Sequence, residues 1–374
     1  MNKLYSASFT LAGTIIGAGV LGLPYVIGQS GFLIGLFWMI IIGFLTLLVY
    51  LMLGEVTLRT KKPHQLPGLA EKYVGRKMKH IIAFLSVSWM YGSLIAYVQG
   101  SGELINSVLG IPPFAAKLMF FIPFSIIVYF GVKGVEKTEY LMTPVIIFST
   151  IVLSIAALFY FEPSNILKTE MSNFFAPVGI IMFALAGTSA IPQMKEILWK
   201  EKKKLRKSIL IGFSIPFFVY IIFTMICIGA LGGGNISEVA TISLGEQYGT
   251  FFLVFGNLFA FFAMATCFVS IGNSLIETYN QDYGINKNTS FLAAILPASI
   301  AFLGLSGFTE ILSLTGCLFI APLMVSIVYL FIKTKKKGER NPEYELKIPN
   351  WSLWTITLFF VFATALVGWQ FLLF

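Results

Sequence analysis

Residues 13–25 read Gly13-Thr14-Ile15-Ile16-Gly17-Ala18-Gly19-Val20-Leu21-Gly22-Leu23-Pro24-Tyr25 and lie in the middle of the first long apolar segment. Four glycines fall within ten positions and a proline follows them, and both residue types are poor helix formers. We therefore expect the helix to open here. Inside a bilayer, open backbone persists only where it lines a cavity or a ligand satisfies it. The stretch is thus a candidate binding site at the membrane midplane.

The composition around this stretch is that of a multi-pass membrane protein. Of 374 residues, 57% are hydrophobic and 11% are charged, whereas a soluble domain has about 25% charged residues. The net charge of +9 does not indicate a nucleic-acid partner, because the basic residues lie in short loops between apolar segments, as topology signals do. The three cysteines lie inside apolar segments without metal-ligand spacing, so we expect neither disulfides nor a metal site.

Eleven apolar segments are long enough to cross a hydrocarbon layer of about 30 Å. Their approximate limits are 4–28, 31–58, 80–108, 113–131, 141–161, 171–198, 208–232, 249–277, 289–306, 309–332 and 351–373. The sequence therefore predicts an all-α membrane protein of about 11 transmembrane helices, forming a single domain over residues 1–374.

The basic residues predict the orientation of these spans. With a cytoplasmic N-terminus, all of the 26 basic residues except Lys117 and Lys168 fall on the cytoplasmic side. A bias of this kind is the usual topology signal. We expect a protein of the cell (plasma) membrane whose N-terminus is cytoplasmic and whose C-terminus, after an odd number of spans, is outside.

The first ten spans divide into two halves of similar length, residues 4–161 and 171–332. Because five is an odd number, the second half enters the membrane from the opposite side. This predicts a five-plus-five inverted repeat, an architecture common among secondary transporters. The eleventh span, 351–373, is an extra helix outside the repeat.

A second interruption lies in the first span of the second half. Residues 183–193 read Phe183-Ala184-Leu185-Ala186-Gly187-Thr188-Ser189-Ala190-Ile191-Pro192-Gln193. Small and hydroxyl residues interrupt the apolar run, and Pro192 removes a backbone donor and bends the chain. The first break alone is equally consistent with close helix packing through small residues. Two breaks in corresponding positions favour discontinuous helices 1 and 6 that form one central binding site.

Two broken helices offer free N–H groups to an anion and free carbonyl groups to a cation. A zwitterionic amino acid matches both. The two interrupted spans have no charged side chain near their breaks, which favours a neutral or zwitterionic substrate over a dicarboxylate or a polyamine. Trp89 and Tyr97 of the third span either line the site or pack between helices.

Polar groups elsewhere in the spans leave two questions open. Hydroxyl groups on the eighth span, among them Thr266 and Ser270, either hold a sodium ion against carbonyls of the first span or bond back to their own helix. Acidic residues inside membranes are functional candidates, but each of the four here falls near a predicted span end. Gate or salt-bridge roles are therefore favoured over a deep proton relay for Glu55, Glu103, Glu196 and Glu277.

Three stretches resemble one known family. Residues 17–25, followed by Gln29-Ser30-Gly31-Phe32, resemble the first-helix signature of the amino acid/auxin permease family, whose bacterial relatives include the tryptophan/tyrosine permeases. Residues 204–220 resemble the loop and seventh helix of those permeases, and residues 183–192 resemble their sixth helix. The resemblance covers the whole chain. It implies the fold of the amino acid–polyamine–organocation superfamily and amino acid transport coupled to a proton or sodium gradient.

Two sets of site residues are expected, and the resemblance, carried over residue by residue, implies all of them except Thr188, Val20 and Ser270. The substrate-binding residues are Thr14, Ile15, Gly17, Ala18, Gly19, Phe183, Ala184, Gly187 and Thr188. The ion-coupling residues are Gly17, Val20, Thr266 and Ser270. Cys267 stands where a serine is expected, which weakens the sodium interpretation, and the fifth span lacks the lysine that replaces sodium in some relatives.

The predicted function is secondary active transport of a neutral amino acid, aromatic ones included, by alternating access. The alternative is a receptor-like subunit of the same fold that senses an amino acid without transporting it. An enzyme is not expected, because the only two histidines lie in a loop and no catalytic set is present. The expected partners are the amino acid and membrane lipid, with no cofactor beyond the coupling proton or sodium ion.

Overall fold

The computed structural model describes the backbone of residues 2–130 and 133–372 and the side chains of residues 2–130 and 144–366. Lys133 and Lys137, which contribute to the predicted topology, and the chain end at Phe374 lie outside the described side chains. Within the described residues every regular element is a helix. An all-helical fold is what the hydropathy pattern predicts.

Each predicted span corresponds to one helix or to consecutive helices. The first half comprises α1 (Lys3–Ile15), α2 (Gly19–Ser30), α3 (Phe32–Leu58), α5 (Arg76–Leu109), α6 (Pro113–Phe130) and α7 (Lys133–Ala157), which continues as η1 (Leu158–Tyr160). The second half comprises α9 (Pro177–Ala184), α10 (Ala190–Ile197), α11 (Leu205–Leu231), α13 (Thr250–Glu277), α14 (Lys287–Ile295), η6 (Leu296–Leu303), α15 (Phe308–Thr315), η7 (Gly316–Ile320) and α16 (Ala321–Lys337). The eleventh span is α17 (Asn350–Leu372).

Not every span is one straight helix. Among the described residues, six helices are by themselves long and apolar enough to cross a membrane, and α1 with α2 forms a seventh such span that bends by 49° at its break. The sixth and ninth predicted spans are each divided into shorter pieces. Interrupted helices are tolerated in a bilayer where neighbouring protein surrounds them.

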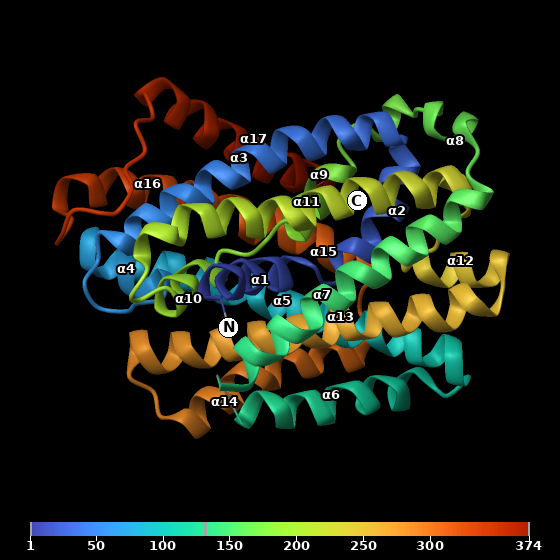
Figure 1. Ribbon diagram of the computed structural model, residues 1–374, viewed down its shortest axis with the longest axis horizontal. Coiled ribbons are helices and arrows are strands. Elements are labelled where there is room, and N and C mark those ends of the chain that lie inside the picture. The colour runs from blue at the N-terminus through green and yellow to red at the C-terminus, as the bar shows by residue number, and fades with distance from the viewer. Residues whose placement is uncertain (1, 131–132, 373–374) are drawn as a thin grey trace.

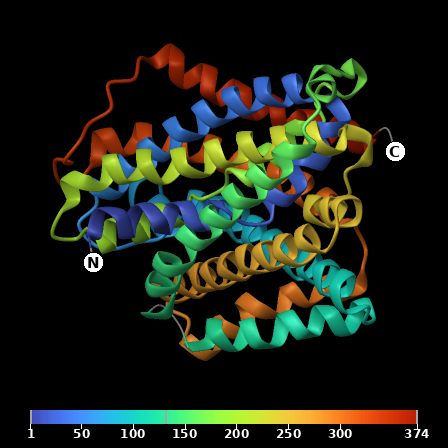
Figure 2. The same ribbon diagram turned by 45° about the vertical axis from the view of Figure 1, so that its right-hand side comes forward.

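The first broken span lies inside the bundle. Figures 1 and 2 show the long helices side by side along the longest axis, with α1 enclosed by its neighbours. Helix α1 contacts α10, α11 and α13, and α2 contacts α9. Every residue from Thr10 to Ile15 is buried. The elements that carry the two breaks therefore meet at the centre of the molecule.

Short helices occupy the connections between spans, where the sequence pattern indicates only polar loops. They are α4 (Leu66–Tyr73), α8 (Pro163–Leu167), η2 (Met171–Asn173), η3 (Lys202–Lys204), η4 (Gly233–Asn235) and α12 (Ala240–Tyr248), followed after α13 by the π-helix η5 (Thr278–Asp282). Proline at an early position favours the start of α4 and of α8, since the missing N–H of a first-turn residue has no helical partner to lose.

The segment between α16 and α17, residues 338–349, folds back on the end of α3, and we call it the strap. Glu55 is fully buried and accepts a bond from Arg59 at 2.9 Å and one from the Leu346 N–H at 2.7 Å. Arg59 also reaches Glu345 at 2.9 Å. Glu55 therefore has the salt-bridge role that its position near a span end favours.

The strap also holds the loop that follows α3. Glu339 accepts the Lys61 N–H at 2.8 Å and pairs with Lys72 at 2.7 Å. The bond from the Lys61 N–H, and then the one from Lys72, lower the pKa of Glu339. This contact contributes stability above the ordinary pKa of a carboxyl group and loses it as the pH falls through the lowered value.

Candidate functional site

The first break separates α1 from α2 at residues 16–18. Ile16 leaves the helical region with φ −74° and ψ 87°. The break is where the cluster of glycines predicts it. Pro24 plays no part in it, because that residue lies inside α2.

Glycine at the break is required by space. A Cβ atom built on Gly17 would lie 2.7 Å from the Cys267 sulfur and 3.1 Å from the Tyr97 hydroxyl oxygen. A Cβ on Gly19 would lie 2.5 Å from the Ala184 Cβ. At both glycines the missing side chain lets the backbone of the first broken span pack closely against a neighbouring helix. Close packing and an opened helix, which the sequence presents as alternatives, occur here together.

The second break separates α9 from α10 at residues 185–189. Gly187 approaches the end of α1 closely, because a Cβ atom there would lie 2.8 Å from Ile15 Cγ1. Pro192 lies in the first turn of α10, where a missing N–H removes no helical hydrogen bond. The expectation that Pro192 bends the chain is therefore wrong in its mechanism: this proline lies in the first turn of the second half-helix, and the bend precedes it.

Two tyrosines that are not among the residues expected from the sequence form hydrogen bonds with the backbone at the breaks. The Tyr220 hydroxyl, on α11, donates to the Ile15 carbonyl at 2.5 Å and contacts the Gly17 N–H. The Tyr50 hydroxyl, on α3, donates to the Leu185 carbonyl at 2.6 Å and accepts the N–H of Gly187. Each tyrosine thus satisfies the carbonyl before a break and the N–H two residues later.

The two tyrosine contacts are related by the repeat. Tyr220 lies 170 residues after Tyr50, and Leu185 and Gly187 lie 170 residues after Ile15 and Gly17. Each tyrosine, however, serves the break in the other half, since Tyr50 of the first half reaches the second break and Tyr220 of the second half reaches the first. The two halves therefore exchange equivalent hydrogen bonds. This constant offset between paired residues is a sequence signal that could have identified both tyrosines.

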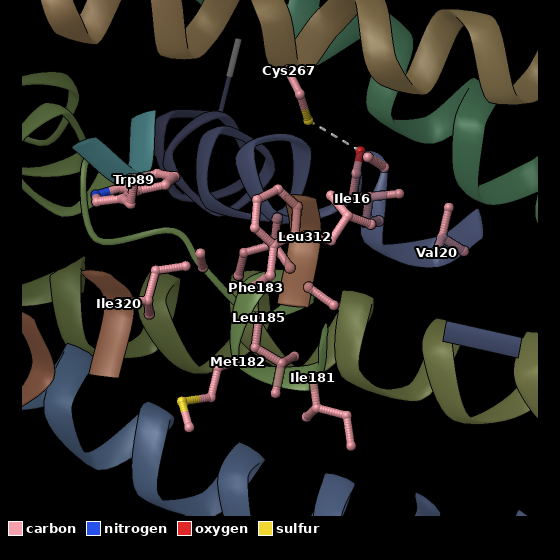
Figure 3. Packing of buried hydrophobic residues seen from close by; sticks show 14 of the residues in the cluster. Ile16, Val20, Trp89, Ile181, Met182, Phe183, Leu185, Cys267, Leu312 and Ile320 are labelled. Carbon is pink, nitrogen blue, oxygen red and sulfur yellow. Dashed lines mark hydrogen bonds between the residues drawn. The ribbon is translucent and has the colours of Figure 1, made fainter. Parts of the chain in front are cut away.

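Helix α13 lines the first break. The Cys267 thiol donates to the carbonyls of Gly13 at 3.0 Å and Ile16 at 3.3 Å, and Figure 3 shows its sulfur directed at the opened turn. Ser270 and Thr14 share a hydrogen bond of 3.3 Å. Thr266 instead donates to Ala263 of its own helix at 3.0 Å.

The substrate-binding residues expected from the sequence fall in one buried region. Phe183 and Ala184 are the last two residues of α9, and Figure 3 shows Phe183 among the side chains around the break. Val20, expected near the coupling ion, is buried in the first turn of α2. The structure buries each of the nine expected substrate contacts: Thr14, Ile15, Gly17, Ala18, Gly19, Phe183, Ala184, Gly187 and Thr188.

Several polar groups near the breaks are free to bind a small molecule. Among the described side chains, the Ser189 hydroxyl and the Trp89 indole N–H are buried without a hydrogen-bond partner. Buried polar groups are usually satisfied. The first turns of α2 and α10 already donate the N–H groups of Val20, Leu21, Ala190 and Ile191 to carbonyls of the break residues, so donors for a ligand would come from the break residues just before each helix. Together these groups offer donors to a carboxylate, while the ends of α1 and α9 offer carbonyls.

A large cavity lies away from the breaks. A cavity of about 810 Å³ is lined by Tyr160, Lys168, Gln247 and residues 232–235. Most of its residues come from the connections around α8, η4 and α12, and Gly28 comes from the end of α2 farthest from the break. It is therefore a separate place at one end of the bundle.

The chain is similar to known proteins along nearly its whole length. A profile of the tryptophan/tyrosine permease family matches residues 1–368. The chain is 26% identical to the tyrosine-specific transport system 1 of Haemophilus influenzae, with 91% of each chain covered. It is 24% identical to glutamine transporter 2 of Aliivibrio fischeri over 92% of each chain, and 24% identical to the low affinity tryptophan permease of Escherichia coli K12, covering 87% of this chain and 86% of that one.

The fold has a counterpart among solved structures. The crystal structure of MhsT in complex with L-phenylalanine superposes with a TM-score of 0.73, covering 97% of both chains at 17% sequence identity. At that identity the likeness concerns the fold alone. It agrees with the five-plus-five inverted repeat with discontinuous first and sixth helices that the sequence predicts.

Proposed function

Because the chain belongs to the tryptophan/tyrosine permease family, we propose that it carries a neutral amino acid, aromatic ones included, across the cell membrane by alternating access. The chain is a multi-pass membrane permease, and the relatives that match it are transporters rather than enzymes. These relatives are named for the transport of tyrosine, glutamine and tryptophan. All three are neutral amino acids, which supports a site that recognises the amino acid backbone.

The observation that carries the proposal is the meeting of four helix ends. The break residues that precede α2 and α10 bring their N–H groups to the positive ends of the two helix dipoles. The ends of α1 and α9 present carbonyls a few residues away, at Ala184 and at Ile15, whose carbonyl also accepts the Tyr220 hydroxyl. An amino acid placed there would direct its carboxylate to the N–H groups and its ammonium group to the carbonyls. Binding of these two charged groups then requires no charged side chain of the protein.

We propose a proton as the coupling ion. A sodium ion between α1 and α13 would require hard oxygen ligands. The Cys267 thiol instead points at the carbonyls of Gly13 and Ile16, and Thr266 is bonded to its own helix. The carbonyls of the first broken span that face α13 and could bind a cation already accept the Cys267 thiol. These contacts support a proton over sodium.

We further propose the orientation and domain organisation expected from the sequence. The N-terminus and the loops rich in lysine and arginine lie in the cytoplasm, and residues 1–374 form one transporter domain with repeats over 4–161 and 171–332.

The test is uptake of labelled L-tryptophan, L-leucine and L-alanine into proteoliposomes, with a pH gradient or a sodium gradient imposed separately. Accumulation that follows the pH gradient and is unchanged when choline replaces sodium supports the proposal. Accumulation that requires sodium would overturn the coupling assignment. Binding without uptake under either gradient would indicate the receptor-like alternative.

A further inference from the structure

The carboxylate of Glu277 lies at the end of α13 and joins three elements. It accepts bonds of 3.3 Å from Gln65, in the loop before α4, and from Gln193 of α10. It accepts a third bond of 3.3 Å from Asn273, one turn earlier on α13. All three donors are neutral. Among the described residues, no lysine, arginine or histidine lies within ion-pair distance of this carboxylate.

The charged groups around Glu277 do not compensate for it. Glu196 of α10 is the charged neighbour whose field acts on it, and that field is repulsive. Lys195 on the same helix donates instead to the Thr60 carbonyl at 2.8 Å. His64, from the loop before α4, lies beside Asp282 at 3.8 Å. A carboxylate removed from water without a cation is costly to hold in its charged form.

Hydrogen bonds connect Glu277 with the first break. Gln193 donates to the Ser274 hydroxyl at 3.1 Å as well as to Glu277. Ser274 bonds to the Ser270 carbonyl at 3.0 Å, and the Ser270 hydroxyl shares a bond with Thr14. Gln193 also lies one turn from the start of α10, where the second break ends. A change at Glu277 can therefore reach both breaks.

We propose that Glu277 is a proton-binding site whose charge state controls a latch, formed by Glu277, Gln65 and Gln193, at the end of the bundle predicted to be cytoplasmic. The ionised carboxylate accepts both glutamine N–H groups and holds α10 against α13. One proton from water converts the carboxylate to a carboxylic acid, which is a weaker acceptor. The glutamines are released, and α10 becomes free to adjust at the substrate site. The inference rests on the proposed proton-coupled transport.

The opposite end of the transporter offers a comparison. Gln99 donates to Glu103 at 2.9 Å near the end of α5, with the same four-residue spacing as Asn273 and Glu277. The third and eighth spans are equivalent in the two halves. Among the described side chains, however, Gln99 is the one that donates to Glu103, whereas Glu277 joins two further elements. This difference is why the latch is assigned to Glu277.

The test compares wild type, Glu277→Gln and the exposed control Glu246→Gln in proteoliposomes. Glutamine imitates the protonated acid without titrating. We expect Glu277→Gln to retain exchange of labelled for unlabelled L-tryptophan but to lose accumulation driven by a pH gradient. Wild type and Glu246→Gln should show both. Accumulation by Glu277→Gln at the wild-type level would overturn the inference while leaving the proposed function intact.

A binding measurement keeps the inference testable if the variant does not transport. We expect the Kd of wild type for L-tryptophan to be at least about fivefold lower at pH 5.5 than at pH 8.0, the lower end of typical coupling between sites. In Glu277→Gln the affinity should be high at both pH values. An unchanged pH dependence, or complete loss of binding, would overturn the latch. Failure of wild type to take up any amino acid under either gradient would instead contradict the proposed function.

Discussion

At the scale of single residues, Gly17 has the tightest surroundings at the first break. Its missing Cβ leaves room for the Cys267 sulfur and the Tyr97 hydroxyl. Tyr97 is thus one of the third-span residues that reach the site, whereas Tyr91 bonds to Tyr279 and to the Ala293 carbonyl, away from the breaks.

Replacing Gly17 should block transport without preventing membrane insertion. Extra atoms in a packed core cost roughly 1–3 kcal/mol, which corresponds to about a 5- to 150-fold change in an equilibrium constant. We expect Gly17→Ala to reduce L-tryptophan uptake by about that factor and Gly17→Leu to abolish it. The matched control is Gly234→Ala, because a Cβ atom there meets nothing within 4 Å. Normal uptake by Gly17→Leu would contradict the assignment of the first break.

The two tyrosine hydroxyls should contribute similarly, because they occupy equivalent positions. Removing one leaves a buried carbonyl and N–H without a partner, at a cost of about 1–3 kcal/mol for each such group. We expect Tyr50→Phe and Tyr220→Phe each to weaken L-tryptophan binding by about tenfold or more, as measured by equilibrium binding to purified protein. Tyr5→Phe, at an exposed tyrosine of α1, serves as the control. Unchanged affinity in both variants would exclude a positioning role for these hydroxyls.

Residue identities in the site were only partly predictable. The glycines of the first break are visible in the sequence because their local cluster is unusual. Tyr50 and Tyr220 sit in apolar helices, and their carbonyl partners lie 135 and 205 residues away along the chain, so no local pattern marks them. Their role depends on tertiary structure, which only the offset between the halves could have suggested.

At the scale of elements, each broken span owes its break to a different local cause. The first has glycine where the chain turns, and the second has a run of small and hydroxyl residues before a proline in the first turn of α10. Apolar runs predicted the spans well because burial in lipid demands them. The short helices α4, α8 and α12 were not predicted, since they depend on packing against the bundle rather than on a long periodic pattern.

The junction between α3 and the strap should depend on one buried ion pair. Arg59 neutralises the buried Glu55, so Arg59→Ala would leave an unpaired buried carboxylate, which costs about 3–5 kcal/mol. Glu345 is 55% exposed, and an exposed ion pair contributes about 0–1 kcal/mol. We expect a clear loss of thermal stability in detergent for Arg59→Ala and almost none for Glu345→Ala. Equal losses of thermal stability in the two variants would show that the Arg59–Glu55 ion pair does not hold the strap against α3.

At the scale of the whole molecule, the two halves are related in chemistry as well as in topology. The sequence predicts the inverted repeat from span count alone. The exchanged tyrosine contacts add a reason for the repeat to stay assembled, because each half satisfies the broken backbone of the other. Movement of one half relative to the other would alter both breaks together. Coordinated change at two opened helices is what alternating access requires.

The proposed orientation is testable by labelling. The three native cysteines are buried, so an introduced surface cysteine can be followed with a membrane-impermeant maleimide. Lys168→Cys should react in intact cells, whereas Lys203→Cys should react only after the membrane is opened. Both lysines are exposed, which makes access to the label comparable. Labelling in the reverse order would invert the proposed topology.

The central claim is that the two broken helices together form the amino acid site. The most direct measurement is an experimental structure of the protein bound to L-tryptophan. The account predicts the amino acid between residues 15–19 and 184–190, with its carboxylate on the N–H groups of the break residues that precede α2 and α10. Binding of L-tryptophan in the cavity of about 810 Å³ beside Tyr160 and Lys168, with the breaks unchanged, would contradict it.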